Sequence, residues 1–500
     1  MAKFRFHILY FFLFFLAAAL PATTSSFEVP RLTMYDPRYV SRHDLAGGQT
    51  LTLTAAMEDF ESHFYNQTLD HFNYRPESYV TFRQRYVVNS KHWAGPGAPI
   101  FVYLGAEAPL THNFSGYKSF LTDIAPSFNA LLLYIEHRYY GESIPYGSRE
   151  EAFRNSSTLG YMSSQQAIAD YAEIILNVKE QFNTDNSPVI VVGGSYGGML
   201  ATWFRLKYPH LAIGALTSSA PILYFDDITP QDAYYNVVTK DFREASETCY
   251  QTIKKSWVEI DETASKLDGL STLGKKFRTC APLKNSTYLT NSLGGLYARA
   301  AQYNAPPNYP VTQICTAIDG SGPDKSTLDR IFAGVVAYYG EKPCYINEPA
   351  QPSETDVGWE WQTCSELVIP IGFGNDTMFW SEDAFNLTGF SHDCKEKYGV
   401  APRPHWVTTY YGGHSIKRVL KRFGSNIIFS NGLKDPYSRG GVLENISDTI
   451  HVVYTTNGSH CLDLYGSRVT DPKWLTAQRE EEIDIMHGWL TTYYKDLQVD

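Results

Sequence analysis

One stretch of the sequence decides the fold: Val189-Ile190-Val191-Val192-Gly193-Gly194-Ser195-Tyr196-Gly197-Gly198. Its four leading apolar residues predict a buried strand, and residues 199–208 continue with a helical pattern. A serine on a sharp turn from strand to helix presents its hydroxyl to a substrate, and the glycines permit the strained backbone. The core fits G-x-S-x-G and indicates that Ser195 is a nucleophile. The alternative is a glycine-rich turn with an incidental serine.

Strand and helix patterns alternate on both sides of this turn. Besides 189–192, we expect strands at 100–104, 131–135, 213–216, 426–430 and 450–454, and a closing helix at 474–494. Such alternation predicts a mainly parallel sheet covered by helices on both faces. Ligands of such sheets bind at the carboxyl ends of the strands, which is where Ser195 lies.

A serine nucleophile needs a histidine base and a carboxylate that orients the histidine. In this class of turn the chain order is serine, acid, histidine. Asp435 and His460 each follow a late predicted strand and a glycine turn. The alternatives are a turn aspartate before Pro436 and a loop histidine, since the chain has 14 histidines. Four rivals are expected to be structural: His137, His405, His414 and Asp463.

An oxyanion hole needs two backbone N–H groups directed at the developing charge. Tyr196, directly after the nucleophile, is the first candidate. The second is Ala106 or Glu107, in the loop after the strand at 100–104.

The N-terminus has the pattern of a signal peptide over residues 1–26, with Lys3 and Arg5 before an apolar run that is short for a membrane span. No later apolar run reaches membrane length. Removing the signal peptide changes the formal net charge from −11 to −13, because Lys3 and Arg5 are lost with no acid. Such a charge does not suit nucleic acid. Residues 27–58 are either a pro-segment or an ordinary extension.

Sequons and cysteines agree with the secretory pathway. Eight asparagines begin N-x-S/T triplets: Asn66, Asn113, Asn155, Asn285, Asn375, Asn386, Asn445 and Asn457. Six of the seven cysteines lie between residues 249 and 394, and sequence alone leaves their pairing open. No Cys or His cluster has zinc spacing, so we expect no metal site and no cofactor.

The cysteine-bearing segment also changes in character, with helical patterns and proline-rich breaks. We expect an inserted helical domain at 225–400 between two parts of the sheet domain, 59–224 and 401–500.

Several ordered blocks carry a resemblance to a known family. They are Gln67-Thr68-Leu69-Asp70-His71-Phe72-Asn73, Thr81-Phe82-Arg83-Gln84-Arg85-Tyr86, Glu136-His137-Arg138-Tyr139-Tyr140-Gly141-Glu142-Ser143, the serine turn, Arg403-Pro404-His405-Trp406 and Phe429-Ser430-Asn431-Gly432 with Asp435-Pro436. With these blocks the chain resembles the serine peptidase family of lysosomal Pro-Xaa carboxypeptidase and dipeptidyl peptidase II. The stretch from Arg403 to Gly413 resembles the carboxypeptidase branch more closely.

The resemblance implies an α/β-hydrolase fold with an inserted helical, disulfide-bearing cap, and cleavage next to proline. It carries the catalytic triad onto Ser195, Asp435 and His460. It also implies the disulfides Cys249–Cys315, Cys280–Cys344 and Cys364–Cys394, and the absence of a further bridge found in the carboxypeptidase branch.

Three positions depart from the family pattern. The family's Asp-Pro-Trp is Asp435-Pro436-Tyr437, and its His-His-Leu-Asp-Leu-Arg is His460-Cys461-Leu462-Asp463-Leu464-Tyr465. Its Gly-Asn-Glu-Gly loop is Gly105-Ala106-Glu107-Ala108. The new neighbours of the histidine leave the pH optimum open, and the tyrosine can reshape the pocket for the scissile residue.

Four functions follow, in order of preference. The first is a serine exopeptidase that removes a C-terminal residue after proline, with peptides of penultimate proline as partners. The others are a dipeptidyl peptidase that releases Xaa-Pro, an esterase or lipase, and a non-catalytic secreted binding glycoprotein. The expected location is the lysosome or vacuole, or the extracellular space. Formation of a homodimer is a further hypothesis.

Overall fold

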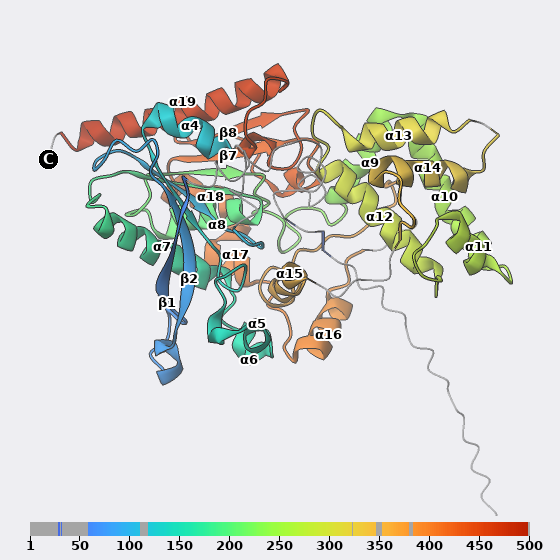
Figure 1. Cartoon of the computed structure of the whole chain (residues 1–500), viewed down its shortest axis with the longest axis horizontal. Helices are drawn as coiled ribbons and strands as arrows, with labels where there is room; N and C mark the ends of the chain where they lie inside the picture. Colours follow the sequence, from blue (N-terminus) through green and yellow to red (C-terminus); the bar gives the residue numbers. More distant parts are fainter. Residues whose placement is uncertain are drawn as a thin grey trace, which may run out of the picture.

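The computed structural model describes residues 29–30, 32, 59–110, 119–322, 324–346, 353–379 and 384–498. An eight-stranded sheet lies at its centre, in the order β1-β2-β4-β3-β5-β6-β7-β8 (Figure 1). β2 pairs antiparallel with β1 and β4, and the strands from β4 to β8 pair in parallel. This order, with helices on both faces, is that of an α/β-hydrolase fold and confirms the expected fold class.

The strands are β1 (Glu61–Thr68), β2 (Thr81–Asn89), β3 (Ile100–Leu104), β4 (Leu131–Ile135), β5 (Val189–Gly194), β6 (Gly214–Ser218), β7 (Ile427–Gly432) and β8 (Ile450–Thr455). Six of them match the predicted strands to within two residues. The β1–β2 hairpin was not predicted, because alternating polar residues on an edge hairpin resemble a surface segment.

Helices cover the two faces of the sheet because successive strand residues point in opposite directions. Phe101 and Tyr103 of β3 pack on the side of α4 (Phe120–Phe128) and α19 (Lys473–Asp496). Ile100 and Val102 pack on the other side, against α7 (Ser164–Gln181) and α8 (Tyr196–Lys207). α19, the predicted closing helix, runs beside α4 along one side of the sheet (Figure 1).

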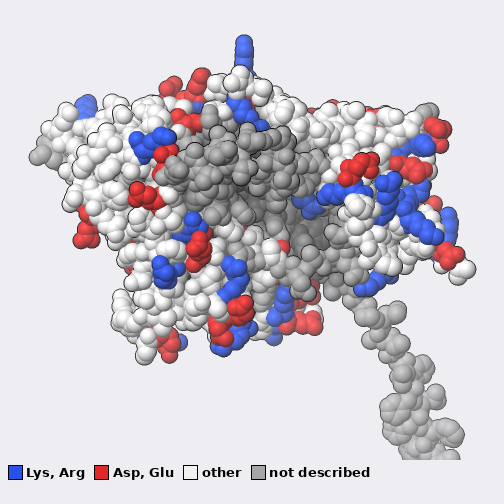
Figure 2. Space-filling model, viewed as in Figure 1, with Lys and Arg blue, Asp and Glu red and all other residues white. Residues whose placement is uncertain are grey.

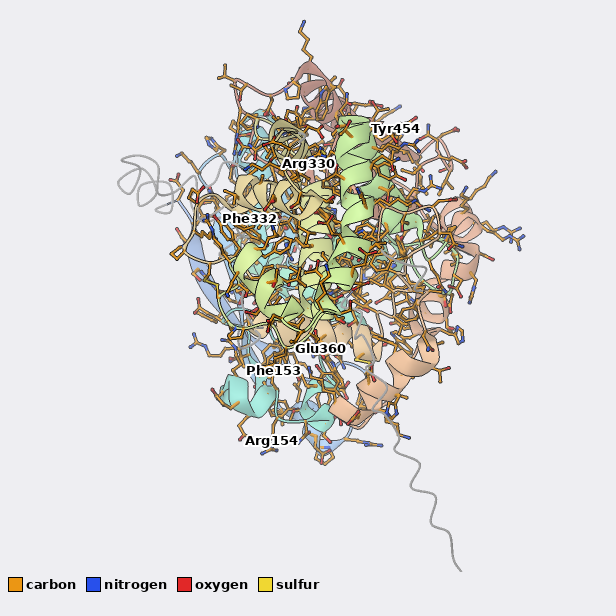
Figure 3. All side chains as sticks on the ribbon, turned by 90° about the vertical axis from the view of Figure 1, so that its right-hand side faces the viewer. Phe153, Arg154, Arg330, Phe332, Glu360 and Tyr454 are labelled. Atoms are coloured by element: carbon orange, nitrogen blue, oxygen red, sulfur yellow. A yellow bond between two sulfur atoms is a disulfide. The ribbon has the colours of Figure 1, made fainter. Side chains whose placement is uncertain are left out.

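A helical insertion separates β6 from β7. Its larger lobe faces the viewer in Figure 3, where Arg330 and Phe332 mark α14 and Glu360 marks α15. Its first two helices, α9 and α10, are separated at Ser246, whose side chain caps α10 by accepting from the Cys249 N–H.

The insertion contains α9 (Ala233–Ala245), α10 (Glu247–Ala264), α11 (Gly269–Lys276), α12 (Ser286–Gln302), α13 (Pro310–Gly320), α14 (Thr327–Tyr339), α15 (Glu354–Ser365) and α16 (Leu387–Tyr398). After it come α17 (Trp406–Tyr411), the short helix η3 (Gly413–Ser415) and α18 (Ile416–Phe423). The turn after β4 carries η2 (Pro145–Gly147), α5 (Arg149–Ala152) and α6 (Ser156–Leu159), and η1 (Pro76–Tyr79) lies in the β1–β2 turn.

Three disulfides staple the insertion, and all six cysteines lie in it. They are Cys249–Cys315, Cys280–Cys344 and Cys364–Cys394, the same pairing that the resemblance implies. The seventh cysteine, Cys461, is a buried free thiol in the sheet domain.

Lys, Arg, Asp and Glu side chains are interspersed over the face shown in Figure 2. Within the described ranges, no helix is both long and apolar enough to cross a membrane.

A buried ion network joins the end of β1 to α7 and the turn after β4. The Arg138 guanidinium donates to both oxygens of Asp170, at 2.7 and 2.6 Å, and to the carbonyls of Thr68 and Leu69. His71 Nε2 lies 2.7 Å from Asp170 Oδ1. Burial alone lowers the pKa of His71, but hydrogen bonds to Asp170 and Glu173 outweigh it and raise the pKa to about 9. Residues of two of the matching sequence blocks, 67–73 and 136–143, are thus joined by this network.

The raised pKa of His71 predicts a pH-dependent contribution to stability. The contribution is fully present below the unfolded-state pKa of 6.5 and is lost as pH rises through about 9. We expect His71→Gln to lower the free energy of unfolding by about 1.5–3 kcal/mol at pH 6. The difference from wild type should shrink at pH 9.5, measured by urea unfolding. His392→Gln, at a position with a 74% exposed side chain, is the control and should change little. A constant difference across this pH range would contradict the assignment.

Candidate active site

Ser195 sits on a strained turn between β5 and α8. Its backbone has φ 61° and ψ −121°, in a region that side-chain-bearing residues rarely adopt. The turn is held by the Ser195 N–H, which donates to the Ser218 carbonyl at the end of β6, at 2.8 Å. This hydrogen bond to β6 therefore stabilises the strained backbone of Ser195.

Two glycines make this turn geometrically possible. A Cβ on Gly193 would lie 2.1 Å from the Gly197 carbonyl oxygen, inside the turn. A Cβ on Gly197 would lie 2.9 Å from the Leu104 carbonyl oxygen at the end of β3. The backbone of the serine turn thus packs directly against itself and against the backbone of β3, with no space for a side chain at either glycine.

The three residues that the sequence indicated are brought together by the loops after β5, β7 and β8. His460 Nε2 lies 2.8 Å from Ser195 Oγ, and His460 Nδ1 lies 2.7 Å from Asp435 Oδ2. Asp435 Oδ1 also accepts from the Tyr437 N–H at 3.0 Å, at the start of η4 (Pro436–Gly440). All three side chains are buried. With the Nδ1 proton donated to Asp435, the Nε2 lone pair can accept the Ser195 proton.

The electrostatics of His460 follow from burial and from its neighbours Asp435 and Cys461. Burial lowers the pKa of His460, but the Asp435 carboxylate, together with Cys461, outweighs this effect and raises the pKa well above 6.5. The surroundings of His460 therefore stabilise the imidazolium that would form during proton transfer.

Comparison with known proteins places the chain in a family. The family model for Serine carboxypeptidase S28 matches residues 67–482. The chain belongs to the serine carboxypeptidase S28 family. It is 37% identical to the lysosomal Pro-X carboxypeptidase of Mus musculus, over 87% of this chain and 90% of that protein. It is 36% identical to the Homo sapiens protein of the same name, over 89% and 91%.

Two further likenesses are more distant. The thymus-specific serine protease of Homo sapiens is 30% identical, over 85% of each chain. Among solved structures, the proline iminopeptidase of Mycobacterium smegmatis gives a TM-score of 0.35 at 12% identity, covering 88% of this chain and 100% of that one.

In this S28 peptidase a buried hydrogen-bond chain holds Tyr196, the residue after the serine. The Tyr196 hydroxyl lies 3.1 Å from His137 Nε2 and accepts from Gln362 Nε2 at 2.8 Å. The Tyr140 hydroxyl donates to Gln362 Oε1 at 2.6 Å. Burial lowers the pKa of His137 to about 4. His137 is therefore neutral at pH 7, with its Nδ1–H donated to the Arg138 carbonyl and its Nε2 free to accept from Tyr196.

The loop after β3 lies beside the serine turn. The Cβ of Ala106 is 3.5 Å from the position that a Cβ on Gly197 would take. Glu107 is fully buried. Both candidates for the second oxyanion donor are thus in the segment that packs against α8.

The rivals to the triad have other partners. Asp463 accepts from the Ser218 hydroxyl at 2.6 Å, from η5 (Leu462–Leu464). His405 and His414 both contact Asp226. His137 supports Tyr196, as described above.

Sequence reasoning missed the residues that the insertion contributes to the site. The His460 N–H donates to the Gln302 carbonyl of α12 at 3.0 Å. The ring of Tyr303, which follows α12, has its centroid 6.1 Å from that of His460. Gln362 comes from α15. No local motif marks Gln302, Tyr303 or Gln362, because each reaches the site only through the packing of the insertion. Tyr437, which the sequence analysis did single out, has its centroid 5.9 Å from that of His460 and comes from η4, outside the insertion.

The hydrogen-bond chain predicts that Tyr196→Phe destabilises the folded protein. Removing the hydroxyl leaves two buried partners, on His137 and Gln362, without their bond, which costs about 1–3 kcal/mol. Urea unfolding measures the loss. Tyr297→Phe is the matched control, because within the described residues its buried hydroxyl has no hydrogen-bond partner. Equal effects of the two substitutions would contradict the prediction.

Proposed function

We propose that this protein is a serine carboxypeptidase that removes the C-terminal residue following a proline. The observation that carries the proposal is the hydrogen-bonded series Ser195–His460–Asp435 in a member of the S28 family. The identity of 36–37% to proteins named lysosomal Pro-X carboxypeptidase, over most of both chains, supports the choice of substrate.

The proposed chemistry proceeds through an acyl-enzyme. Ser195 Oγ attacks the prolyl carbonyl carbon while His460 Nε2 accepts the hydroxyl proton. His460 returns the proton to the leaving amine, so that the C–N bond breaks and the last residue departs. A water molecule, deprotonated by His460, then hydrolyses the ester. Asp435 holds the imidazole in the required tautomer throughout.

The developing oxyanion is assigned to backbone N–H groups of Tyr196 and of Ala106 or Glu107. Support comes from the short distance between the β3 loop and the turn at Gly197. The hydrogen bonds of the Tyr196 hydroxyl also hold the backbone N–H of Tyr196 in place.

Aromatic rings suit a prolyl side chain at this site. The Tyr437 ring packs edge-on against Tyr234, with centroids 4.9 Å apart, and lies beside His460 together with Tyr303. The flat, apolar faces of such rings match the pyrrolidine ring better than a charged or branched side chain.

Two peptides test the direction of cleavage. The first has a blocked N-terminus and ends in Pro-Xaa with a free carboxylate; the second begins with a free Xaa-Pro and has a blocked C-terminus. We expect only the first to be cut, with loss of its last residue alone, measured by mass spectrometry. Cleavage of only the second would favour the dipeptidyl peptidase. Cleavage of short-chain esters alone would favour an esterase or lipase.

Ser195→Ala should abolish the cleavage and the labelling by a fluorophosphonate while the protein stays folded. Wild-type protein that is folded but neither labels nor cleaves would favour a non-catalytic binding glycoprotein.

The Asp435 carboxylate predicts a shift in the pH profile. Because it raises the pKa of His460, Asp435→Asn should lower that pKa and move the acid limb of kcat/KM to lower pH. The rate itself should fall by about 10⁴-fold, since the asparagine no longer holds the correct tautomer. An acid limb that stays in place would contradict the assignment of Asp435.

We further propose that residues 27–58 form an inhibitory pro-segment. Support comes from two described positions of this segment. The Tyr437 hydroxyl donates to the Pro30 carbonyl, and Leu32 is fully buried in the hydrophobic cluster that contains Tyr437. Tyr437 lies beside His460, so Pro30 contacts a direct neighbour of the proposed catalytic base.

Leu32→Asp should therefore raise activity toward the Pro-Xaa peptide, because a buried unpaired charge drives the segment out. Ser195→Ala in the same background should remove the gain. A folded Leu32→Asp protein with unchanged activity would contradict the pro-segment.

The same proposal places the protein in the secretory pathway, ending in the lysosome or vacuole or outside the cell. Seven of the eight sequon asparagines are described, and all seven are exposed; Asn113 lies outside the described residues. The signal peptide at 1–26 also lies outside them. We also propose that the inserted cap domain spans residues 225–400, which the helices between β6 and β7 support. A homodimer remains a hypothesis, to be tested by light scattering.

A further inference from the structure

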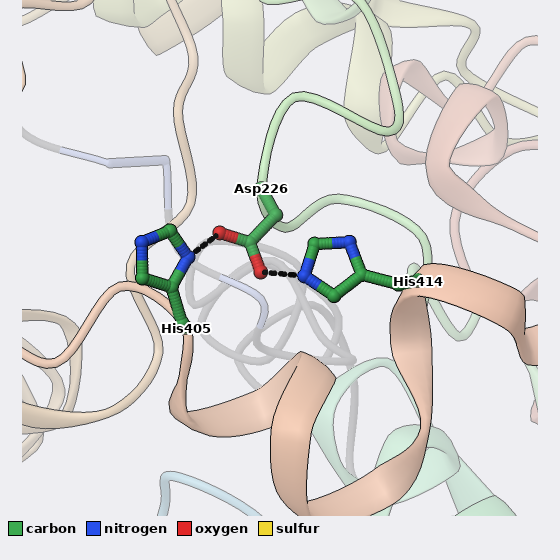
Figure 4. Close-up of side chains that lie close together, drawn as sticks. All are labelled: Asp226, His405 and His414. Atoms are coloured by element: carbon green, nitrogen blue, oxygen red, sulfur yellow. Dashed lines mark hydrogen bonds and ion pairs between the residues drawn. The ribbon is translucent and has the colours of Figure 1, made fainter.

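Asp226, His405 and His414 bring a carboxylate and two imidazoles together outside the triad (Figure 4). One possible ligand atom from each lies within 4.8 Å of the others. Asp226 follows β6, where the chain leaves the sheet for the helical insertion. His405 and His414 precede β7, where the chain returns. The cluster therefore joins the two connections of the insertion to the sheet domain.

The backbone around the cluster is shaped to bring these side chains together. Asp226 has φ 54°, in the left-handed region. Gly412, with φ 80°, ends α17 and reverses the chain, so that His414 returns to the side of His405. The Thr408 hydroxyl donates to the Asp226 carboxylate. The carboxylate is thus fixed in place from within the fold.

The exposure of the three side chains suits an ion that enters from solvent. The Asp226 side chain is only 5% exposed, whereas those of His405 and His414 are 73% and 61% exposed. His405 Nδ1 contacts Asp226 Oδ1, and His414 Nε2 lies 3.3 Å from Asp226 Oδ2. One nitrogen of each ring therefore already faces the carboxylate from opposite sides, and the rings have room to turn.

We propose that Asp226, His405 and His414 form a binding site for a transition-metal dication, with zinc as the first choice. Imidazole nitrogen with one carboxylate oxygen is a ligand set of zinc, nickel and copper, while magnesium and calcium prefer oxygen alone. Bonds of about 2.0–2.1 Å place two nitrogens about 3.4 Å apart in a tetrahedral site. The possible ligand atoms now lie within 4.8 Å of one another, so the two exposed rings would have to turn to reach this geometry. Three protein ligands leave the fourth position to water.

Bound zinc would clamp the two connections of the insertion to each other. The loop that carries Asp226 continues from Ser218, whose carbonyl accepts the Ser195 N–H. The clamp would therefore restrain the connection that begins at the strand end holding Ser195. An ion that binds only the folded state stabilises that state in proportion to the logarithm of its concentration.

The test uses mature protein freed of metal with a chelator and titrated with zinc chloride in a calorimeter. We expect one equivalent to bind, and the Tm to rise with zinc but not with magnesium. His405→Gln and His414→Gln should each weaken binding at least about tenfold and together abolish the Tm shift. His392→Gln, an equally exposed histidine outside the cluster, should bind as wild type does.

A second control separates this site from the catalytic histidine. Protein labelled on Ser195 with a fluorophosphonate should still bind one equivalent of zinc. The proposal is overturned if wild type shows neither heat of binding nor a Tm shift. It is also overturned if the folded double variant binds zinc as wild type does, or if the label abolishes binding.

Discussion

A serine held at positive φ between a buried strand and a helix is the constraint on which this structure depends. The conformation costs about 1–3 kcal/mol and persists only where its surroundings leave no alternative. Here the surroundings are backbone: the Gly197 carbonyl inside the turn, the Leu104 carbonyl at the end of β3 and the Ser218 carbonyl at the end of β6. The turn is thus positioned by its own backbone and by two neighbouring strands, β3 and β6.

The same edge of the sheet gathers the rest of the site. The loops after β5, β7 and β8 supply Ser195, Asp435 and His460, because parallel strands end at one edge. The last residue of β6, Ser218, supplies the carbonyl that holds Ser195, and its hydroxyl donates to Asp463. The two carboxylates therefore have different partners. Asp435 contacts His460, whereas Asp463 accepts from Ser218 and holds the end of β6.

The helical insertion is bonded into the catalytic loops. The Gln302 carbonyl accepts from the His460 N–H, and the Gln362 side chain binds the hydroxyl of Tyr196. One contact holds the backbone of His460, and the other holds the side chain that follows Ser195. The insertion therefore helps to position both residues.

The sequence by itself determined the elements whose signals are local. Six strands, the serine turn and the order Ser195, Asp435, His460 follow from apolar runs, glycines and position after a strand. Only the tertiary structure decided what depends on distant segments. These contacts are the β1–β2 hairpin at the sheet edge, Gln302 and Tyr303 beside His460, Gln362 on Tyr196, and the meeting of Asp226 with two histidines about 180 residues later. Such contacts leave no periodic pattern, because they are made by the packing of distant segments and not by the chain near each residue.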